Sequence, residues 1–253
     1  MVYDLQKANL WKRIAAWIFD GIVVVSLAVG FAFLLSAALD YDGHGQTVND
    51  AYAKYERTYG VVFDITQEEY EAMDKAQREN YDAAYEALTA DEVAMNAYQM
   101  MVNLMLVITS AAILLAVLLW ELVIPLFLKN GQTLGKKIFG LCLVRIDGVK
   151  MNNMQLFTRT LLGKCVVETM IPVFIVMMIY WGIVGLSGTL CLLVLLVAQA
   201  MCMIFSHTNS AIHDLMAGTV VVDMASQMIF RTTEDLIEYK KRIAAERASR
   251  QSY

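Results

Sequence analysis

The first apolar stretch of the chain begins Lys12-Arg13-Ile14-Ala15-Ala16-Trp17-Ile18-Phe19-Asp20 and continues without a charged residue from Gly21 to Leu39. About 20 apolar residues suffice for a helix to cross a bilayer, so this stretch is predicted to span a membrane. Arg13 and Asp20 are seven residues apart, close to two helical turns, and therefore lie on one face. A charge inside a span usually faces protein or a water-filled cavity, so we expect this face to point inward.

The composition extends this prediction to the whole chain. Of its 253 residues, 58% are hydrophobic and 18% are charged, and the mean hydropathy is +0.50. These values are typical of an all-α membrane protein with several spans. The uncharged run 169–211 is too long for one helix and is divided by the glycine-rich segment 181–188. We therefore predict four spans, at residues 12–39, 97–128, 160–181 and 188–206.

Basic residues predict the orientation of these spans. They comprise Lys7, Lys12 and Arg13 before the first span, seven residues from Lys129 to Lys164, and six residues from Arg231 to Arg250. By the positive-inside rule, both termini and the loop 129–159 are cytoplasmic and the acidic loop 40–96 is extracytoplasmic. We expect a multi-pass protein of the cell membrane whose first span is retained as an anchor. The net charge of −5 argues against a nucleic-acid partner. The predicted segments are 1–39, 40–96, 97–128, 129–159, 160–206 and 207–253.

The extracytoplasmic loop is predicted to be helical. It is rich in alanine, glutamate and tyrosine and contains no proline. Capping-box patterns at Thr47, Thr66 and Thr89 predict helix starts, and the last helix is expected to continue into the second span. One interpretation is a small helical cap that packs on itself. The other is a docking surface for an external protein partner.

A small β element is predicted among the cytoplasmic segments. Leu141–Ile146 is rich in β-prone residues and precedes the turn signal Asp147-Gly148. A second β-prone segment, Gly218–Asp223, follows the fourth span, so the two strands are expected to pair at the cytoplasmic mouth of the bundle. Residues 206–217 are expected to form a polar exit and one short helical turn, and 233–250 a charged helix near the lipid headgroups.

The residue types that form catalytic and metal sites do not occur here at the spacing of a known motif. The four cysteines, Cys142, Cys165, Cys191 and Cys202, have neither metal-ligand spacing nor a disulfide framework and are interpreted as structural thiols. His207 and His213 are interpreted as polar groups at helix ends. The sequence shows no nucleophile elbow, phosphate-binding loop, zinc motif or redox pair. We therefore expect no enzyme, no metal site and no cofactor.

Each of the two prolines lies four residues after a glutamate. The pairs are Glu121 with Pro125 and Glu168 with Pro172. Proline in a helix cannot donate to the carbonyl four residues back, so the carbonyl oxygens of both glutamates are predicted to lose their helical partner. Each motif then combines a carboxylate with a freed carbonyl oxygen. Hard cations prefer such ligands, and broken helices recur at the ion sites of transporters.

The depth of the acids suggests a shared layer. Asp20, Glu121 and Glu168 each lie eight or nine residues from a basic residue at the cytoplasmic side, about 12–13 Å along a helix. We predict a cation or proton site formed by these three acids with Asp214, and charge partners Arg13, Arg159 and Lys164. Neighbouring carboxylates favour a shared proton or cation. The alternative is a structural network in which the basic residues simply neutralise the acids.

The chain resembles the RDD family of bacterial membrane proteins, named for one arginine and two aspartates. Four pieces carry the resemblance: Arg13-x-x-Ala16-x-x-x-Asp20, Gly131-x-Thr133-x-Gly135-Lys136-Lys137-x-x-Gly140-Leu141, Arg159, and His213-Asp214-x-x-Ala217-Gly218-Thr219-x-Val221-Val222. The resemblance implies that Arg13, Asp20 and Asp214 are the arginine and the two aspartates for which the family is named. It also implies a membrane protein with a role in transport. The long acidic segment 40–96 departs from the family pattern.

Two functions follow as expectations. The first is cation- or proton-coupled transport through the cytoplasm-facing layer of carboxylates, with a proton or monovalent cation as the ion. The second is a non-transporting adaptor or regulator that binds a membrane enzyme or complex. Four spans are few for a transporter that works alone, so a homo-oligomer in the lipid bilayer is expected.

Overall fold

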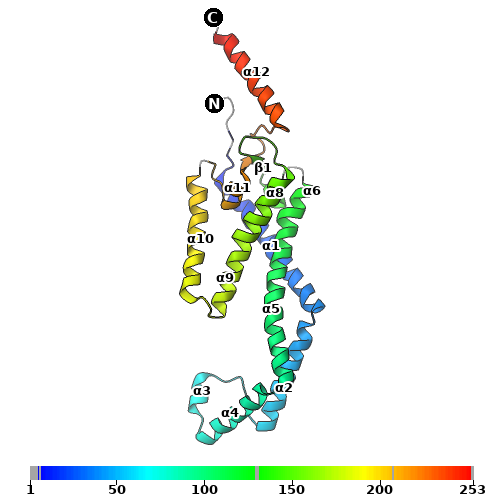
Figure 1. The fold of residues 1–253 in the computed structure, drawn as a ribbon, viewed down its shortest axis with the longest axis vertical. Coiled ribbons are helices and arrows are strands. Elements are labelled where there is room, and N and C mark those ends of the chain that lie inside the picture. The colour runs from blue at the N-terminus through cyan, green and yellow to red at the C-terminus, as the bar shows by residue number, and fades with distance from the viewer. Residues whose placement is uncertain (1–4, 6, 129–130, 207, 252–253) are drawn as a thin grey trace. The chain divides into compact units, whose positions relative to one another are not determined.

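The fold was analysed in a computed structural model that describes residues 5, 7–128, 131–206 and 208–251 (Figure 1). Lys129 and His207, which entered the predictions as a basic anchor and a helix-end group, lie outside these residues. Within them, four helical stretches are long and apolar enough to cross a membrane. They are Leu10–Ala38, Glu92–Phe127, Asn153–Tyr180 and Gly185–Phe205. The prediction of four helices long and apolar enough to span is confirmed, with the second and third beginning several residues earlier than expected.

The chain divides into two compact units, Val29–Ala112 and the remainder of the chain. The smaller unit contains the end of α1 (Leu10–Ala38), α2 (Tyr41–Tyr59), α3 (Gln67–Ala72), α4 (Lys75–Thr89) and the start of α5 (Glu92–Leu118). The larger unit contains the other ends of α1 and α5 and all later elements. The charged residues discussed below belong to the larger unit.

The smaller unit is helical, as predicted, but only one of the three threonines predicted to cap a helix does so. Thr66 caps α3 through a complete capping box with Glu69. Thr47 lies within α2 and donates to the carbonyl of Gly43, and Thr89 ends α4 and donates to the carbonyl of Tyr85. At these two positions the threonine hydroxyl bonds back to the preceding turn of its own helix and caps no new one. The helix predicted after Thr89 is α5, which begins at Glu92 and is capped by Asp91.

Aromatic rings pack against one another in the smaller unit. Phe63 lies edge-on to Tyr52, Tyr81 and Tyr85. Asp91 precedes α5 and accepts hydrogen bonds from the backbone of Val93 and Ala94 and from the hydroxyl of Tyr55. Asp91 therefore caps α5. This helix runs from Glu92 to Leu118, so the prediction that the last helix continues into the second span is confirmed.

The larger unit contains the predicted β element. β1 (Leu141–Arg145) pairs antiparallel with β2 (Thr219–Asp223), with Leu143 opposite Val221. One face of this two-stranded sheet packs Leu141, Leu143 and Val221 against Ala8 and Ala16, which ties the sheet to α1. The predicted turn at Asp147-Gly148 is also present, since Gly148 adopts a left-handed φ of 84° and donates to the carbonyl of Arg145.

The third and fourth spans are joined by a glycine turn, as predicted. α9 (Ile171–Tyr180) ends before Trp181, and α10 (Gly185–Phe205) runs back beside it (Figure 1). Gly182 and Gly185 both have positive φ, which allows this tight reversal. After α10 come α11 (Ile212–Ala217) and, after β2, the charged helix α12 (Thr233–Gln251). Leu236 of α12 is buried against Val149 and Phe230.

Both prolines are preceded by π-helical turns. η1 (Leu119–Val123) precedes Pro125 of α6 (Ile124–Phe127), and η2 (Thr158–Met170) follows α8 (Asn153–Phe157) and precedes Pro172 of α9. A wider turn shifts the backbone acceptor by one residue and so accommodates the missing N–H of proline. The freed carbonyl oxygen of Glu121 accepts a hydrogen bond from the hydroxyl of Thr160, 3.0 Å away. This carbonyl oxygen therefore has a hydrogen-bond donor within the protein.

Candidate functional site

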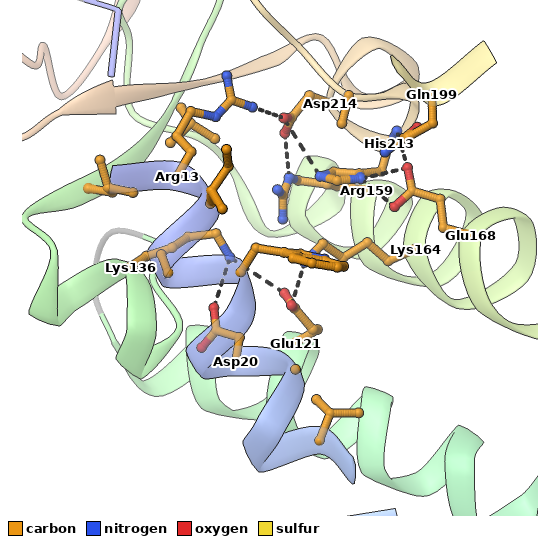
Figure 2. Close-up of a pocket in the computed structure, with 18 of the residues that line it drawn as sticks. Arg13, Asp20, Glu121, Lys136, Arg159, Lys164, Glu168, Gln199, His213 and Asp214 are labelled. Atoms are coloured by element: carbon orange, nitrogen blue, oxygen red, sulfur yellow. Dashed lines mark hydrogen bonds and ion pairs between the residues drawn. The ribbon is translucent and has the colours of Figure 1, made fainter. Parts of the chain in front are cut away.

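A charged cavity of about 500 Å³ lies among α1, η1, η2, α10 and α11 of the larger unit (Figure 2). Its ionisable lining residues are Arg13, Asp20, Glu121, Lys136, Arg159, Lys164, Glu168, His213 and Asp214. The rest of the lining is largely apolar and includes Val24, Val117 and Met203. Arg13 and Asp20 both face this cavity, so the prediction that their face of the first span points inward is confirmed.

Asp20 is held by three hydrogen bonds. Its Oδ1 accepts from Nε1 of Trp120 at 2.9 Å and from the backbone N–H of Gly135 at 3.0 Å, and its Oδ2 accepts from the hydroxyl of Thr133 at 2.5 Å. The carboxylate is 4% exposed and anchors the start of α7 (Leu134–Ile138) on α1. Asp20 therefore fixes the loop after the second span.

Lys136 lies between the carboxylates of Asp20 and Glu121. Its Nζ is 3.9 Å from Oδ2 of Asp20 and 3.6 Å from Oε2 of Glu121, and it donates to the hydroxyl of Thr133 at 3.2 Å. Lys164 of η2 pairs with the other carboxylate oxygen of Glu121. Burial is the main cause that lowers the pKa of Lys136 to about 8. The positive charges of Lys164 and Arg159 lower this pKa further, whereas the carboxylates of Glu121 and Asp20 raise it.

Asp214 is the centre of a second cluster. Its Oδ1 accepts from Nε of Arg159 at 2.8 Å and from the hydroxyl of Thr219 at 3.2 Å. Arg13 lies 3.6 Å from Oδ2 and also donates to the backbone carbonyl of Asn209. Burial opposes ionisation of Asp214, but Arg159, His213 and Arg13 outweigh it and hold the pKa of this carboxyl well below its usual range.

His213 connects Asp214 to the third span. Its Nδ1 lies 2.7 and 2.8 Å from the two carboxylate oxygens of Glu168, and its backbone N–H donates to Oε1 of Glu168 at 3.2 Å. Its Nε2 is 3.6 Å from Oδ2 of Asp214. Burial is the main cause that lowers the pKa of His213 below its ordinary value. The interpretation of His213 as a simple helix-end group missed this pairing.

Close backbone contact positions α11 against η2. A Cβ atom added to Gly163 would lie 2.5 Å from Cβ and 2.7 Å from Cα of His213. The side chain of Gln199 on α10 accepts from the backbone N–H of Ile212 at 3.2 Å. The short helix that carries His213 and Asp214 is therefore held on both sides, by η2 and by α10.

We expect Gly163→Ala to destabilise the protein by about 1–3 kcal/mol, because its methyl group would overlap His213 and the packed helices must move apart. The measurement is thermal unfolding of the purified protein in detergent. Gly21→Ala is the matched control, since a Cβ at Gly21 meets no atom within 4 Å. That control should be neutral or slightly stabilising, because alanine is the better helix former. Equal stability of the two variants would contradict the close contact.

The cavity is balanced in charge among the described residues. Asp20, Glu121, Glu168 and Asp214 oppose Arg13, Lys136, Arg159 and Lys164. No group of three or more histidine, cysteine, aspartate or glutamate residues in the described ranges is arranged to hold a metal ion. Two carboxylate oxygens, Oε2 of Glu121 and Oδ2 of Asp214, are buried without a hydrogen-bond donor. Acids and bases in such contact are suited to exchanging protons.

The predicted residues meet in two clusters instead of one layer of acids. Asp20 and Glu121 are linked through Lys136, whereas Glu168 pairs with His213 and Asp214 with Arg159. All three predicted charge partners are found on acids: Arg13 and Arg159 on Asp214, and Lys164 on Glu121. Sequence reasoning missed the roles of Lys136, Trp120 and Thr133. Thr133 and Lys136 lie within the quoted motif that follows the second span, which was the available signal.

The chain matches one family model among known proteins. No curated protein and no solved structure is significantly similar to the chain. A model of the RDD family matches residues 7–218, which include the charged residues of the cavity and β1 and end just before β2. This membrane protein therefore belongs to the RDD family.

Proposed function

We propose that this RDD-family protein couples transport across the bilayer to proton exchange within the charged cavity. The observation that carries the proposal is the pairing of Lys136 with Glu121. The lysine is 8% exposed, and the carboxylate oxygen that faces it at 3.6 Å has no hydrogen-bond donor. The proton that Lys136 carries is the one exchanged.

The pKa of Lys136 supports the proposal. Because burial lowers it to about 8, Lys136 carries a positive charge below this pH and is neutral above it. With Lys136 charged, the four acids and four bases of the cavity balance. With Lys136 neutral, the cavity has a net charge of −1, which favours entry of a monovalent cation. Release of the proton and entry of the cation would thus be linked.

The topology expected from the basic residues completes the proposal. Both termini, the β element and α12 would be cytoplasmic, and the smaller unit would lie outside the cell membrane. Lys136 would then exchange its proton near the cytoplasmic side. The protein would act without a resident metal or cofactor and without enzymatic activity of its own, as a homo-oligomer in the membrane.

Lys136→Arg is expected to reduce coupled proton flux about tenfold or more. Arginine keeps the positive charge but does not lose its proton in proteins, so the exchange step is blocked. The measurement is proton flux into proteoliposomes that contain pyranine, driven by an imposed Na⁺ or K⁺ gradient between pH 6.5 and 9. The wild type should change its rate near pH 8, and Lys136→Arg should lose this change.

Lys137→Arg is the matched control, because Lys137 is the exposed neighbour of Lys136 on the same short helix. It should retain wild-type flux. Equal flux in Lys136→Arg and wild type would contradict the proposed coupling. Absence of flux in the wild type would favour the adaptor function. In that case, deletion of residues 45–90 should abolish binding of a membrane partner while the four spans remain folded.

A further inference from the structure

We infer that His213 and Asp214 form a second proton-binding site, in which a proton is held between Nε2 of the imidazole and Oδ2 of the carboxylate. Its role in transport rests on the proposed function, but the site itself rests on the geometry of these two side chains. Neither residue is part of the Lys136 and Glu121 pair. The ligand is the proton alone.

The contacts of His213 determine its tautomer. An ionised carboxylate only accepts hydrogen bonds, and Nδ1 lies 2.7 and 2.8 Å from the two oxygens of Glu168. Nδ1 must therefore carry a hydrogen and donate it to Glu168. In a neutral imidazole the other nitrogen, Nε2, is then left as a lone-pair acceptor.

That acceptor faces another acceptor. Oδ2 of Asp214 lies 3.6 Å from Nε2, and it is buried without a hydrogen-bond donor. The side chain of Asp214 is 0% exposed, so bulk water does not satisfy this oxygen. The guanidinium of Arg13 also lies 3.6 Å from this oxygen. Two acceptors that face each other with no hydrogen between them are unfavourable, and one added proton removes the conflict.

The surrounding charges come from three elements. Glu168 of η2 and Asp214 of α11 favour a charged His213, whereas Arg159 and Lys164 of η2 oppose it. Arg13 of α1 competes for the same oxygen of Asp214, and α10 contributes the uncharged Gln199. Burial and the basic residues prevail, so the pKa of His213 is lowered and the site is empty at neutral pH. Below that pKa, a hydronium ion transfers its proton to Nε2 and departs as water.

The site is also rigid. The contact of His213 with Gly163 leaves no room for the α11 backbone to approach η2 more closely, and Gln199 holds the first residue of α11. Thr219 and Arg159 fix Oδ1 of Asp214, which leaves Oδ2 directed at the imidazole. The separation of the two acceptors is therefore set by the fold and does not depend on a mobile side chain.

Nitrogen-15 NMR of the full chain in nanodiscs, with only histidine labelled, tests the site. The chain has three histidines, and His213→Gln identifies the signal of His213. At pH 7.5 we expect Nδ1 to be protonated and Nε2 to be bare. As the pH falls, Nε2 should gain a proton with a pKa below 6.5, and its hydrogen should shift downfield because it bonds to Asp214.

Two variants with opposite effects test the partner. Asp214→Asn removes the negative charge and should lower the pKa of His213 by about 1 or more. Arg13→Gln removes the competing cation and should raise it. Asp147→Asn, in the turn after β1, is the control for a carboxylate outside the cavity and should leave the pKa of His213 unchanged. The titration of His213 in the wild type tests the proton-binding site even if Asp214→Asn does not fold.

A neutral His213 with its proton on Nε2 would overturn the inference, as would an imidazole that stays charged or stays neutral from pH 4.5 to 8. The proposed transport fails on a different measurement, the proton flux of the wild type. A His213 that titrates as described in a protein without flux would preserve the site and reject transport. Proton flux in the wild type, together with a neutral His213 that carries its proton on Nε2, would preserve transport and reject the site.

Discussion

Asp20→Ala is expected to lower the free energy of unfolding by about 3–5 kcal/mol, the cost typical of removing one partner from a buried charged cluster. The variant leaves the indole N–H of Trp120 and the backbone N–H of Gly135 without an acceptor, and both groups are buried. It also leaves Lys136 with one carboxylate fewer. We expect the purified variant to lose its single peak in size-exclusion chromatography and to unfold at a much lower temperature.

Asp223→Ala is the matched control for this effect. Asp223 pairs with Lys12 at 2.6 Å, but the side chain of Lys12 is 46% exposed, and exposed ion pairs contribute at most about 1 kcal/mol. Asp223→Ala should therefore lower the free energy of unfolding far less than Asp20→Ala does. A stable Asp20→Ala protein that has lost proton flux would instead assign Asp20 to transport and contradict its anchoring role.

Arg159→Met is also expected to lower the free energy of unfolding by about 3–5 kcal/mol. The side chains of Arg159 and Asp214 are 2% and 0% exposed, and their atoms meet at 2.8 Å. Methionine preserves much of the volume but leaves Asp214 with the hydroxyl of Thr219 at 3.2 Å and the guanidinium of Arg13 at 3.6 Å. The measurement is again the thermal unfolding of the protein in detergent, at pH 7.5.

A double-mutant cycle separates the pair from its surroundings. If the loss comes from an uncompensated charge on Asp214, then Asp214→Asn together with Arg159→Met should be more stable than Arg159→Met alone. Simple addition of the two single losses would show that the residues act independently. That result would contradict the ion pair as the reason for their burial.

The sequence was sufficient for the main features of the fold. Long apolar runs predict the four spans because a helix must exceed the thickness of a bilayer. The β-prone runs 141–146 and 218–223 predict the strand pair, which the structure confirms. The capping patterns at Thr47 and Thr89 failed because a threonine hydroxyl bonds equally well to the preceding helical turn.

The sequence was also sufficient to select most charged residues of the cavity. A charge within an apolar run is conspicuous because hydrocarbon excludes it, so Arg13, Asp20, Glu121 and Glu168 stand out. Lys136 does not stand out, because it lies in a loop where basic residues are ordinary. Its burial and its position between two carboxylates exist only once α7 is folded onto α1.

By itself, the sequence determined which elements form, since the length and period of apolar residues depend on neighbours along the chain. Only the tertiary structure decided which charges pair. Arg13 and Asp20 lie on one face of α1, yet seven residues separate them by about 10 Å along the helix. Coulomb energy and hydrogen bonding fall steeply over such a distance, so each charge pairs with the nearest segment. For Asp20 that segment is the start of α7, and for Arg13 it is the segment that carries Asn209 and Asp214.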